Sequence, residues 1–396
     1  MVKWTFMVYL AGNEVDATMM AHAKRAFDEL CQIGSNRWLR IVAQYDRGGN
    51  SGAQRYFMRK KGQLPRGMPA PGGSPANPGT LLGFIKWVRQ HHRAEHYALL
   101  LLSHGCGWTP PADQCKRHWW AMHSQGRIIP ESICRGCNQK NHAAWWVEGL
   151  YYDGRQDSID TFGLDHALTE VRKTLGQKLD LLILDACLMS NVEVAYQLRR
   201  SVKFMLASAL TCGLDWPYRA TLGTLRGSDR VRPKHLAKTI VEEVARAEQR
   251  GAPFSQAALN LGRISGVAKS LRQLAGYLRN PGTMMKAIEH ANKHVDGFDY
   301  ALCDINSFCT DLRENKNGYI EECVRRSARK VCDALKPGDG NFMLAERHGG
   351  TGTRNFGGVT VYLPTSSKKV LPCYRLLEFA KDTGWKDMLD TLHHAA

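Results

Sequence analysis

Residues 179–191 read LDLLILDACLMSN, and this stretch joins an apolar run to a cysteine. The first seven residues are apolar except for two aspartates. Continuous hydrophobicity of this kind is typical of a strand that is covered on both faces, as in a parallel sheet. Cys187 follows directly. An unpaired cysteine is most often a small buried hydrophobe, so a catalytic role for Cys187 needs support from elsewhere in the chain.

Five further runs have the composition of strands and are separated by turn signals or helical patterns. They lie at residues 4–12, 39–46, 96–103, 203–210 and 357–364, the last closed by Pro364. Helical spacing of apolar residues predicts three helices: one capped by Thr80 and continuing to Val88, one at 161–175 and one at 234–249. Strands that alternate with helices predict an α/β fold, with a mostly parallel sheet and helices on both faces.

The domain organisation is expected to be a single unit over residues 1–396. We predict a core at 1–230, which contains an insertion at 109–150, and a C-terminal part at 231–396 that packs on the core. The insertion changes abruptly to Trp, Cys, His, Arg and Pro without a clear period.

Bulk composition indicates a globular chain with a basic surface. The 396 residues are 43% apolar and carry a formal net charge of +17, which favours acidic partners but does not define a fold. No run approaches the roughly 18 apolar residues of a membrane-spanning helix. The start has no clear charged segment and no small-residue cleavage site, so we expect no secretory signal. The 12 cysteines are scattered, so free thiols, metal ligation or catalysis are expected before disulfides. We therefore expect a cytoplasmic protein that has no membrane partner.

A second strand of the predicted sheet also ends in a reactive side chain. HYALLLLS (96–103) leads into His104 and Gly105, as LDLLILD leads into Cys187. In open α/β sheets, ligands bind beyond the carboxyl ends of the strands. If one right-handed crossover joins the two strands, His104 and Cys187 emerge at the same edge.

The local settings of these residues suit nucleophilic catalysis. Ser190 and Glu193 have the spacing of a capping box, which predicts that Cys187 lies near a helix N-terminus that favours its thiolate. An imidazole titrates near neutral pH, so His104 can act as base or acid. The backbone N–H groups of Gly105 and Cys187 are candidates for an oxyanion hole.

The chain resembles the clostripain-like cysteine peptidases, which are relatives of caspases, gingipains and legumains. The resemblance rests on SHGCGW (103–108) and LDACLMSNVEVAYQLR (184–199). It extends to WTFMVYLAGN (4–13), VAQYDR (42–47), DWPY (215–218), GGVTVYLPT (357–365) and FAKDTGW (379–385), and so to nearly the whole chain.

The resemblance implies a cysteine endopeptidase that cleaves protein or peptide substrates after arginine, possibly lysine, without a required cofactor. It places the catalytic dyad at His104 and Cys187, and it places Asp185 in the pocket for the residue before the cut bond. Some relatives need calcium. Acidic residues often precede the Trp-Pro-Tyr turn in the family, whereas this chain has Cys212 there, which leaves the pocket walls and any calcium site open.

The insertion contains four residues with the spacing of a metal site. Cys115 and His118 form one close pair, and Cys134 and Cys137 form a second pair after a mid-length loop. Two such pairs are typical of tetrahedral zinc, so we predict a structural zinc ion there, against the alternative of thiols that are merely exposed or packed.

The connection between His104 and Cys187 is longer than a crossover requires. In the family this connection is commonly cut to activate the enzyme, often by the enzyme itself. The resemblance therefore implies a zymogen that is cut there, by itself or by an upstream protease, after one of several basic residues: Lys116, Arg117, Arg127, Arg135, Lys140 or Arg155.

The alternative function is a nucleic-acid-binding or regulatory protein built on a peptidase-like fold. It rests on the net charge, on the zinc module, and on two tryptophan pairs that could stack on bases: Trp119 with Trp120, and Trp145 with Trp146. Such a binder has no need for Cys187 and His104 at strand ends.

Overall fold

The computed structural model describes thirteen stretches of the chain. They are residues 2–11, 17–47, 52–71, 76–108, 159–213, 216–248, 253–280, 282–287, 301–314, 320–350, 353, 356–364 and 370–394.

The apolar run LDLLILD forms strand β6 (Leu179–Asp185), and all seven of its residues are buried. Successive side chains of β6 point to opposite faces of the sheet. Leu182 packs in one hydrophobic cluster and Ile183 in the other, on the far side. Burying such a side chain contributes about 1.5–3 kcal/mol, so both faces of this strand stabilise the fold.

Asp180 is one of two aspartates in this otherwise apolar strand, and it carries a carboxylate into the core. Its oxygens accept hydrogen bonds from the Tyr97 backbone N–H at 3.0 Å and from Lys203 Nζ at 2.7 Å. A buried charge is tolerated when it is paired and hydrogen-bonded, and here the partners come from the two neighbouring strands.

The main sheet places β6 near its middle. Five parallel strands form the centre, and antiparallel strands extend both edges. In spatial order the nine strands are β10 (Met343–Gly349), β8 (Phe254–Asn260), β7 (Val202–Ala207), β6, β5 (Ala94–Leu102), β1 (Val2–Ala11), β2 (Leu39–Asp46), β3 (Ala53–Phe57) and β4 (Met68–Pro69).

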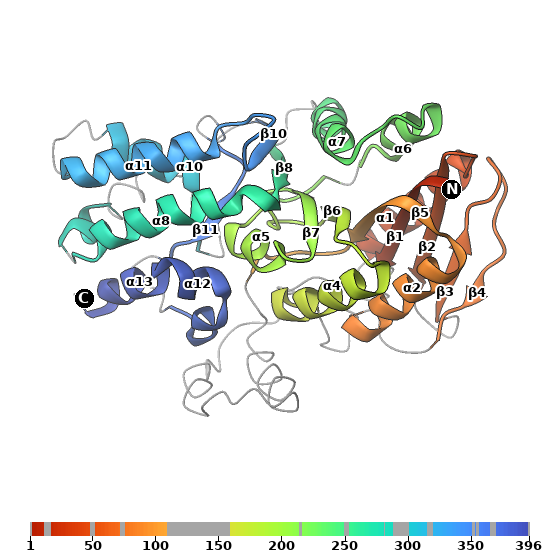
Figure 1. Ribbon diagram of the computed structural model, residues 1–396, viewed down its shortest axis with the longest axis horizontal. Helices are drawn as coiled ribbons and strands as arrows, with labels where there is room; N and C mark the ends of the chain where they lie inside the picture. The colour runs from red at the N-terminus through yellow and green to blue at the C-terminus, as the bar shows by residue number, and fades with distance from the viewer. Residues whose placement is uncertain are drawn as a thin grey trace.

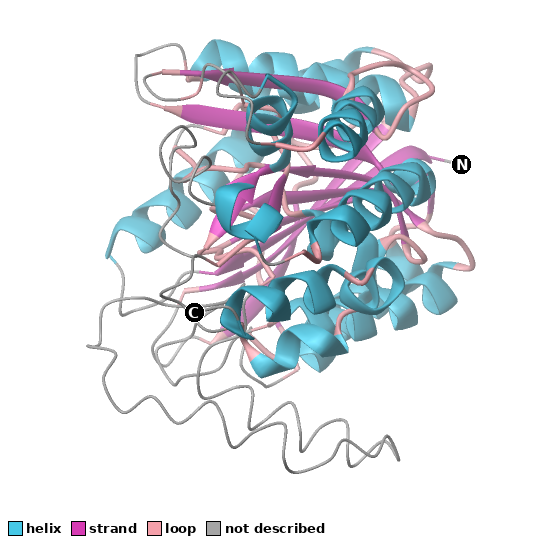
Figure 2. Cartoon of the chain, turned by 90° about the vertical axis from the view of Figure 1, so that its left-hand side faces the viewer, coloured by secondary structure: helices cyan, strands magenta, loops and turns pink. Residues whose placement is uncertain are grey.

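Helices cover both faces of this sheet, as Figure 2 shows. One face packs against α1 (Ala17–Ile33), α6 (Tyr218–Gly227) and α7 (Pro233–Ala247). The other packs against α2 (Pro78–His91), α4 (Thr161–Leu175), α5 (Val192–Leu198) and α8 (Ile264–Leu278). The predicted α/β class with a mostly parallel sheet is confirmed.

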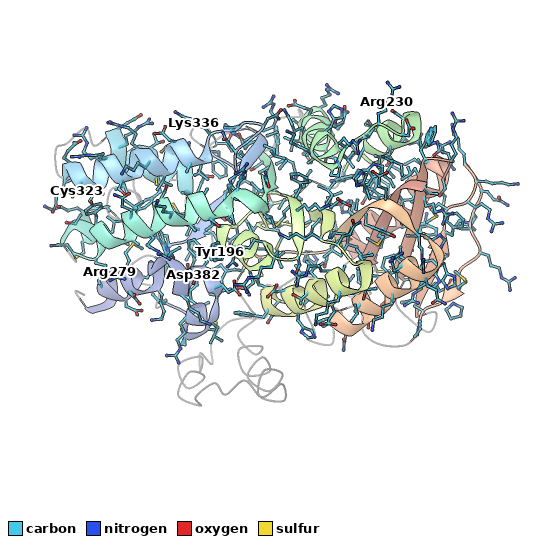
Figure 3. The ribbon with its side chains drawn as sticks, viewed as in Figure 1. Tyr196, Arg230, Arg279, Cys323, Lys336 and Asp382 are labelled. Carbon is cyan, nitrogen blue, oxygen red and sulfur yellow. The ribbon has the colours of Figure 1, made fainter. Side chains whose placement is uncertain are left out.

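The last quarter of the chain adds a helical layer beside α8 (Figure 1). Its elements are β9 (Leu302–Asp304), α10 (Ile305–Glu314), α11 (Glu322–Leu335), β11 (Thr360–Tyr362), α12 (Glu378–Thr383) and α13 (Trp385–His394). Strands β9 and β11 pair with each other in a separate antiparallel sheet. Figure 3 shows one contact of this layer, in which the Tyr196 hydroxyl of α5 donates to Asp382 of α12 at 2.7 Å.

The start of α2 differs from the prediction. Asn77, not Thr80, is the N-cap, and its side chain accepts a hydrogen bond from the Gly79 N–H at 2.7 Å. Pro78 occupies the first turn, where its fixed φ suits a helix and its missing N–H has no cost. The helix therefore begins before the apolar pattern does.

Candidate active site

The two strand ends singled out from the sequence lie side by side. Strand β5 pairs in parallel with β6, with Leu102 opposite Asp185. One residue further on, the Ser103 N–H still donates to the Asp185 carbonyl oxygen at 3.3 Å. His104 and Cys187 therefore leave the sheet at the same edge, from adjacent strands.

Gly105 lets the chain after His104 pass directly against the backbone at Cys187. A Cβ added at Gly105 would overlap with the Cys187 carbonyl oxygen and would stand 3.0 Å from the Ala186 Cβ. A side chain at position 105 would push the two segments apart. The glycine is therefore required by the close approach that keeps His104 near the thiol.

The turn that carries Cys187 is held in an unusual conformation. Leu188 has φ of +61°, which is costly for a branched residue by roughly 1–3 kcal/mol. The Leu188 N–H donates to the Leu210 carbonyl at 3.0 Å, and the Ser190 N–H donates to the Ser208 carbonyl at 2.8 Å. These bonds to the segment after β7 fix the turn.

Cys212 is the residue that most directly changes the chemistry of Cys187. Hydrogen bonding from the Cys212 thiol, together with the Cys212 backbone N–H at 3.3 Å and the charge of His104, lowers the pKa of Cys187 to about 6. The same interaction and burial raise the pKa of Cys212 well above its ordinary value. Cys187 is therefore largely thiolate at neutral pH, and thiolate is the nucleophilic form.

The capping box predicted after Cys187 is not formed. The N-cap of α5 is Asn191, whose side chain accepts the Val194 N–H at 3.3 Å. The Ser190 hydroxyl instead donates to the Gly358 carbonyl at 2.5 Å. Helix α5 begins at Val192 and is short, and the groups that lower the pKa of Cys187 include Cys212 and His104.

Glu193, the other half of that expected capping box, is fully buried and anchors the C-terminal part of the chain. Its Oε1 accepts the Tyr362 N–H at 2.9 Å and the Tyr374 hydroxyl at 2.7 Å. Burial raises the pKa of Glu193 to about 7. Trp108, the last residue of SHGCGW, packs against both tyrosine rings with centroids 4.9 and 4.8 Å away.

Asp185 lies two residues before Cys187 and lines a narrow pocket. The Tyr218 hydroxyl donates to its Oδ2 at 3.4 Å, and His22 Nε2 is 3.7 Å from the same oxygen. Burial, with the nearby negative charges of Cys187 and Glu248, raises the pKa of Asp185 to about 7. The pocket is lined by Leu184, Asp185, Ser208, Thr211, Cys212, Gly213, Trp216, Val244, Glu248, Phe254, Ser255 and Gln256.

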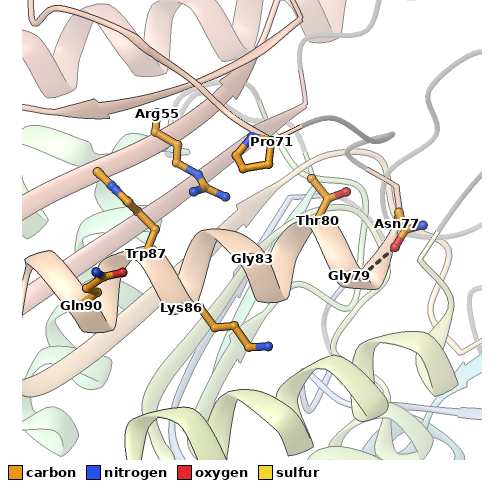
Figure 4. Close-up of a pocket in the computed structure, with 9 residues that line it drawn as sticks. All are labelled: Arg55, Pro71, Asn77, Gly79, Thr80, Gly83, Lys86, Trp87 and Gln90. Carbon is orange, nitrogen blue, oxygen red and sulfur yellow. Dashed lines mark hydrogen bonds between the residues drawn. The ribbon is translucent and has the colours of Figure 1, made fainter.

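A larger pocket beside α2 has the opposite charge (Figure 4). Arg55, Lys86 and Trp87 line it, and none of its lining residues is a cysteine, histidine or carboxylate. The candidate active site is therefore the narrower pocket next to Cys187.

Sequence reasoning identified His104, Gly105, Asp185 and Cys187 but gave Cys212 no role. Cys212 was noted only as a departure from an acidic pattern, and it is 25 residues from Cys187. Its contact depends on the pairing of β6 with β7, which places the residues after both strands at one edge.

The predicted zinc ligands and cleavage positions lie outside the described residues, as does the whole insertion at 109–150. Within the described part of the chain, no group of three His, Cys, Asp or Glu side chains could hold a metal ion. The helices of that same part include none long and apolar enough to cross a membrane.

Comparison with known proteins gives a consistent result. A family model described as the clostripain family matches residues 138–391, which include Asp185 and Cys187 but begin after His104. A clostripain from Hathewaya histolytica is 22% identical, and the match covers 80% of this chain and 63% of that protein. The chain therefore spans less than two thirds of that relative's length.

Two solved structures share the fold over nearly the whole chain. An inactive zymogen C11 protease from Parabacteroides distasonis has a TM-score of 0.66 at 15% identity, covering 96% of this chain and 97% of the other. A secreted C11 cysteine protease from Bacteroides thetaiotaomicron, solved with an irreversible peptide inhibitor, has the same TM-score and identity and covers 97% and 100%.

Proposed function

Because this chain belongs to the clostripain family of cysteine peptidases, we propose that it is an endopeptidase that cleaves after arginine, and also after lysine, with Cys187 as nucleophile and His104 as its acid–base partner. The observation that carries the proposal is the lowered pKa of Cys187, about 6, at the edge where His104 also emerges. A thiolate next to an imidazole is the arrangement that acyl transfer to sulfur requires.

The proposed reaction has two steps. The Cys187 sulfur attacks the substrate carbonyl carbon, and His104 donates a proton to the departing amine as the C–N bond breaks. Water then attacks the thioester while His104 accepts its proton, which releases the acid and restores Cys187. The N–H groups of Gly105 and Cys187 are proposed to stabilise the negative oxygen in both steps.

The proposed preference for a basic residue before the cut bond rests on Asp185. This carboxyl group is 5% exposed and lies two residues before the nucleophile. A cationic side chain in the pocket would restore the charged form of Asp185, which burial disfavours. A guanidinium can also pair with it through two N–H groups, which favours arginine.

Activation by cleavage between His104 and Cys187 belongs to the same proposal. Its support is the fold shared with a protein described as an inactive zymogen. The candidate positions remain the six basic residues of the insertion region: Lys116, Arg117, Arg127, Arg135, Lys140 and Arg155. Zinc bound by Cys115, His118, Cys134 and Cys137 remains a prediction, which metal analysis of the purified protein tests directly.

The experiment that tests the function compares wild-type protein with Cys187→Ala on short peptides whose residue before the reporter group is Arg, Lys, Asp or Leu. We expect wild-type protein, after activation by limited proteolysis, to release the reporter from Arg and Lys peptides alone, and the variant to release none. Equal turnover by the two proteins would exclude Cys187 as the nucleophile. Wild-type turnover of the Asp or Leu peptides would exclude basic specificity.

The nucleic-acid alternative gains no support from the described residues, because its stacking tryptophans lie in the insertion. It predicts nucleic-acid affinity that falls steeply with salt and is unchanged in Cys187→Ala. If the wild-type protein cleaves peptides and shows no such nucleic-acid binding, the endopeptidase proposal stands and the alternative fails.

A further inference from the structure

The pocket beside Cys187 contains two carboxyl groups that come from different elements. Asp185 ends strand β6, whereas Glu248 is the C-cap of α7, and both line the pocket. Lysine and arginine are absent from the residues that line this pocket in the described part of the chain. The remaining polar lining groups are hydroxyls, a thiol and an amide, so the pocket has a net negative charge whenever either carboxyl group is ionised.

The position of Glu248 is linked to the nucleophile through the backbone of the 212–213 segment. A Cβ added at Gly213 would overlap with Glu248 Oε1 and would lie 2.7 Å from the Glu248 Cδ. The carboxylate therefore rests directly against Gly213. Its neighbour Cys212 donates its N–H to Cys187 Sγ at 3.3 Å. One short segment thus separates the second carboxylate from the reacting sulfur.

The two carboxyl groups repel each other. The negative charge of Glu248 is among the causes that raise the pKa of Asp185, after burial itself. His22 and Arg25 of α1 also face Asp185, yet the pKa remains raised to about 7. Because Asp185 is buried and Glu248 adds to the negative charge around it, the pocket favours entry of a positively charged group.

We propose that Glu248 is a second specificity-determining carboxylate, which binds the cationic head of the residue before the cut bond together with Asp185. This inference rests on the proposed function and adds a residue that the motif around Cys187 does not contain. Glu248 takes the place of the acidic residues that this chain lacks between β7 and Trp216, where it has Thr211, Cys212 and Gly213.

The geometry favours arginine over lysine. A guanidinium has five N–H donors in a planar fork, so it can bond the carboxylates of Asp185 and Glu248 at the same time. An ammonium is a compact point charge on a flexible stem. Removing one of the two carboxylates should therefore reduce binding of arginine more than binding of lysine.

The test combines a change in the enzyme with a matched change in the substrate. Wild-type protein, Glu248→Gln and Asp185→Asn are assayed on three peptides that differ only before the reporter group: arginine, lysine and citrulline, which has the shape of arginine without its charge. Glu242→Gln is the control, because Glu242 lies on the same helix, pairs with Arg347 at 2.7 Å and does not line the pocket.

We expect Glu248→Gln to lower kcat/KM for the arginine peptide about tenfold, mainly through KM, which is typical of losing one charge-assisted hydrogen bond. The lysine peptide should lose less, and the citrulline peptide should change by less than about twofold, because a neutral head gains little from the carboxylate charge. Glu248→Asp should recover part of the arginine preference. The Glu242→Gln control should match wild-type protein on all three peptides.

Two outcomes separate this inference from the proposed function. If wild-type protein does not distinguish arginine from citrulline, the basic specificity itself fails. If wild-type protein and Asp185→Asn behave as proposed but Glu248→Gln keeps the full arginine preference, the role of Glu248 is overturned and the proposed function stands. An equal loss on arginine and citrulline peptides would show a structural effect and would also overturn the role.

Discussion

Among the described residues, two pairs of cysteines hydrogen-bond each other, and only one of these pairs lies at a strand edge with a histidine. In the first, Cys212 lowers the pKa of Cys187 to about 6. In the second, Cys309 of α10 hydrogen-bonds Cys332 of α11 and lowers the pKa of Cys332 to about 7, while burial raises that of Cys309. Paired thiols therefore produce one acidic thiol in both places.

The difference lies in what surrounds the acidic thiol. Cys187 is partly exposed, and the charge of His104 lowers its pKa. Cys332 is only 6% exposed, and the groups that act on it are Cys309, Thr310, Arg313 and Asp333. A low pKa supplies a thiolate, but catalysis also needs access for a carbonyl and a group that can protonate the leaving amine. The comparison predicts that the two pairs respond differently to the same changes.

The largest difference is expected from removing each acidic thiol in turn. Cys187→Ala should lower kcat/KM on an arginine peptide by on the order of 10⁴-fold or more, because the nucleophile is lost. Cys332→Ala should change it by less than about twofold, since that thiol lies between helices away from the pocket. Steady-state kinetics on both variants checks this. A comparable loss in both would remove the distinction between the two pairs.

Replacing the imidazole should have the next largest effect. His104→Ala is expected to lower kcat/KM by about 10²–10⁴-fold, the usual contribution of general acid–base catalysis. It should also raise the pKa of Cys187, because the positive influence of His104 is lost, and leave the reactivity of Cys332 unchanged. Alkylation by iodoacetamide at pH 7, followed by mass spectrometry, measures both thiols in one sample. Unchanged labelling of Cys187 would mean that His104 does not act on its ionisation.

A smaller effect is expected from Cys212→Ala, which removes the thiol partner but keeps the backbone N–H. The alkylation rate of Cys187 in wild-type protein should rise through a midpoint near pH 6, following its pKa. In Cys212→Ala the midpoint should move to higher pH because the thiolate loses a hydrogen bond. A midpoint near pH 7 would lower the alkylation rate at pH 5 by roughly tenfold. Cys332 should label slowly throughout because it is buried. A midpoint that stays in place would assign the low pKa to His104 and the Cys212 backbone N–H, without the Cys212 thiol.

The smallest effect concerns stability and the carboxyl group beside the first pair. The folded-state pKa of Asp185 is raised to about 7, so the stability that this group contributes is full below about pH 4 and is lost as the pH rises through 7. Asp185→Asn should therefore gain stability relative to wild-type protein between pH 4 and pH 8, by a few degrees in Tm. Thermal unfolding at both pH values tests this. An equal Tm difference at the two pH values would contradict the raised pKa.

Sequence patterns predicted the centre of the sheet because its strands are apolar on both faces. Residues 179–185 form β6 with the predicted bounds, and the helix at 161–175 is α4 with the predicted bounds. The outer strands were missed. β8 (FSQAALN) and β10 (MLAERHG) mix polar and apolar residues, so neither shows the continuous hydrophobicity of the central strands, although the five middle residues of β8 are buried.

The sequence predicted only those site residues that lie at or directly after the end of an apolar strand. His104, Gly105, Asp185 and Cys187 follow apolar runs, and parallel pairing then brings them together. Cys212 and Glu248 depend on how the segment after β7 folds back and where α7 ends, and no local pattern specifies either. Ser190 and Glu193 have the spacing of a capping box, yet their partners are residues 358, 362 and 374, far along the chain.

Those distant partners have a consequence for how the protein is made. Chains emerge from the ribosome N-terminal end first, and domains fold as their segments become available. A nascent chain that ends before Tyr374 already contains His104 and Cys187 but lacks the complete set of bonds that Gly358, Tyr362 and Tyr374 form with the turn after Cys187. The order of synthesis itself thus delays assembly of the nucleophile turn until Tyr374 has been added.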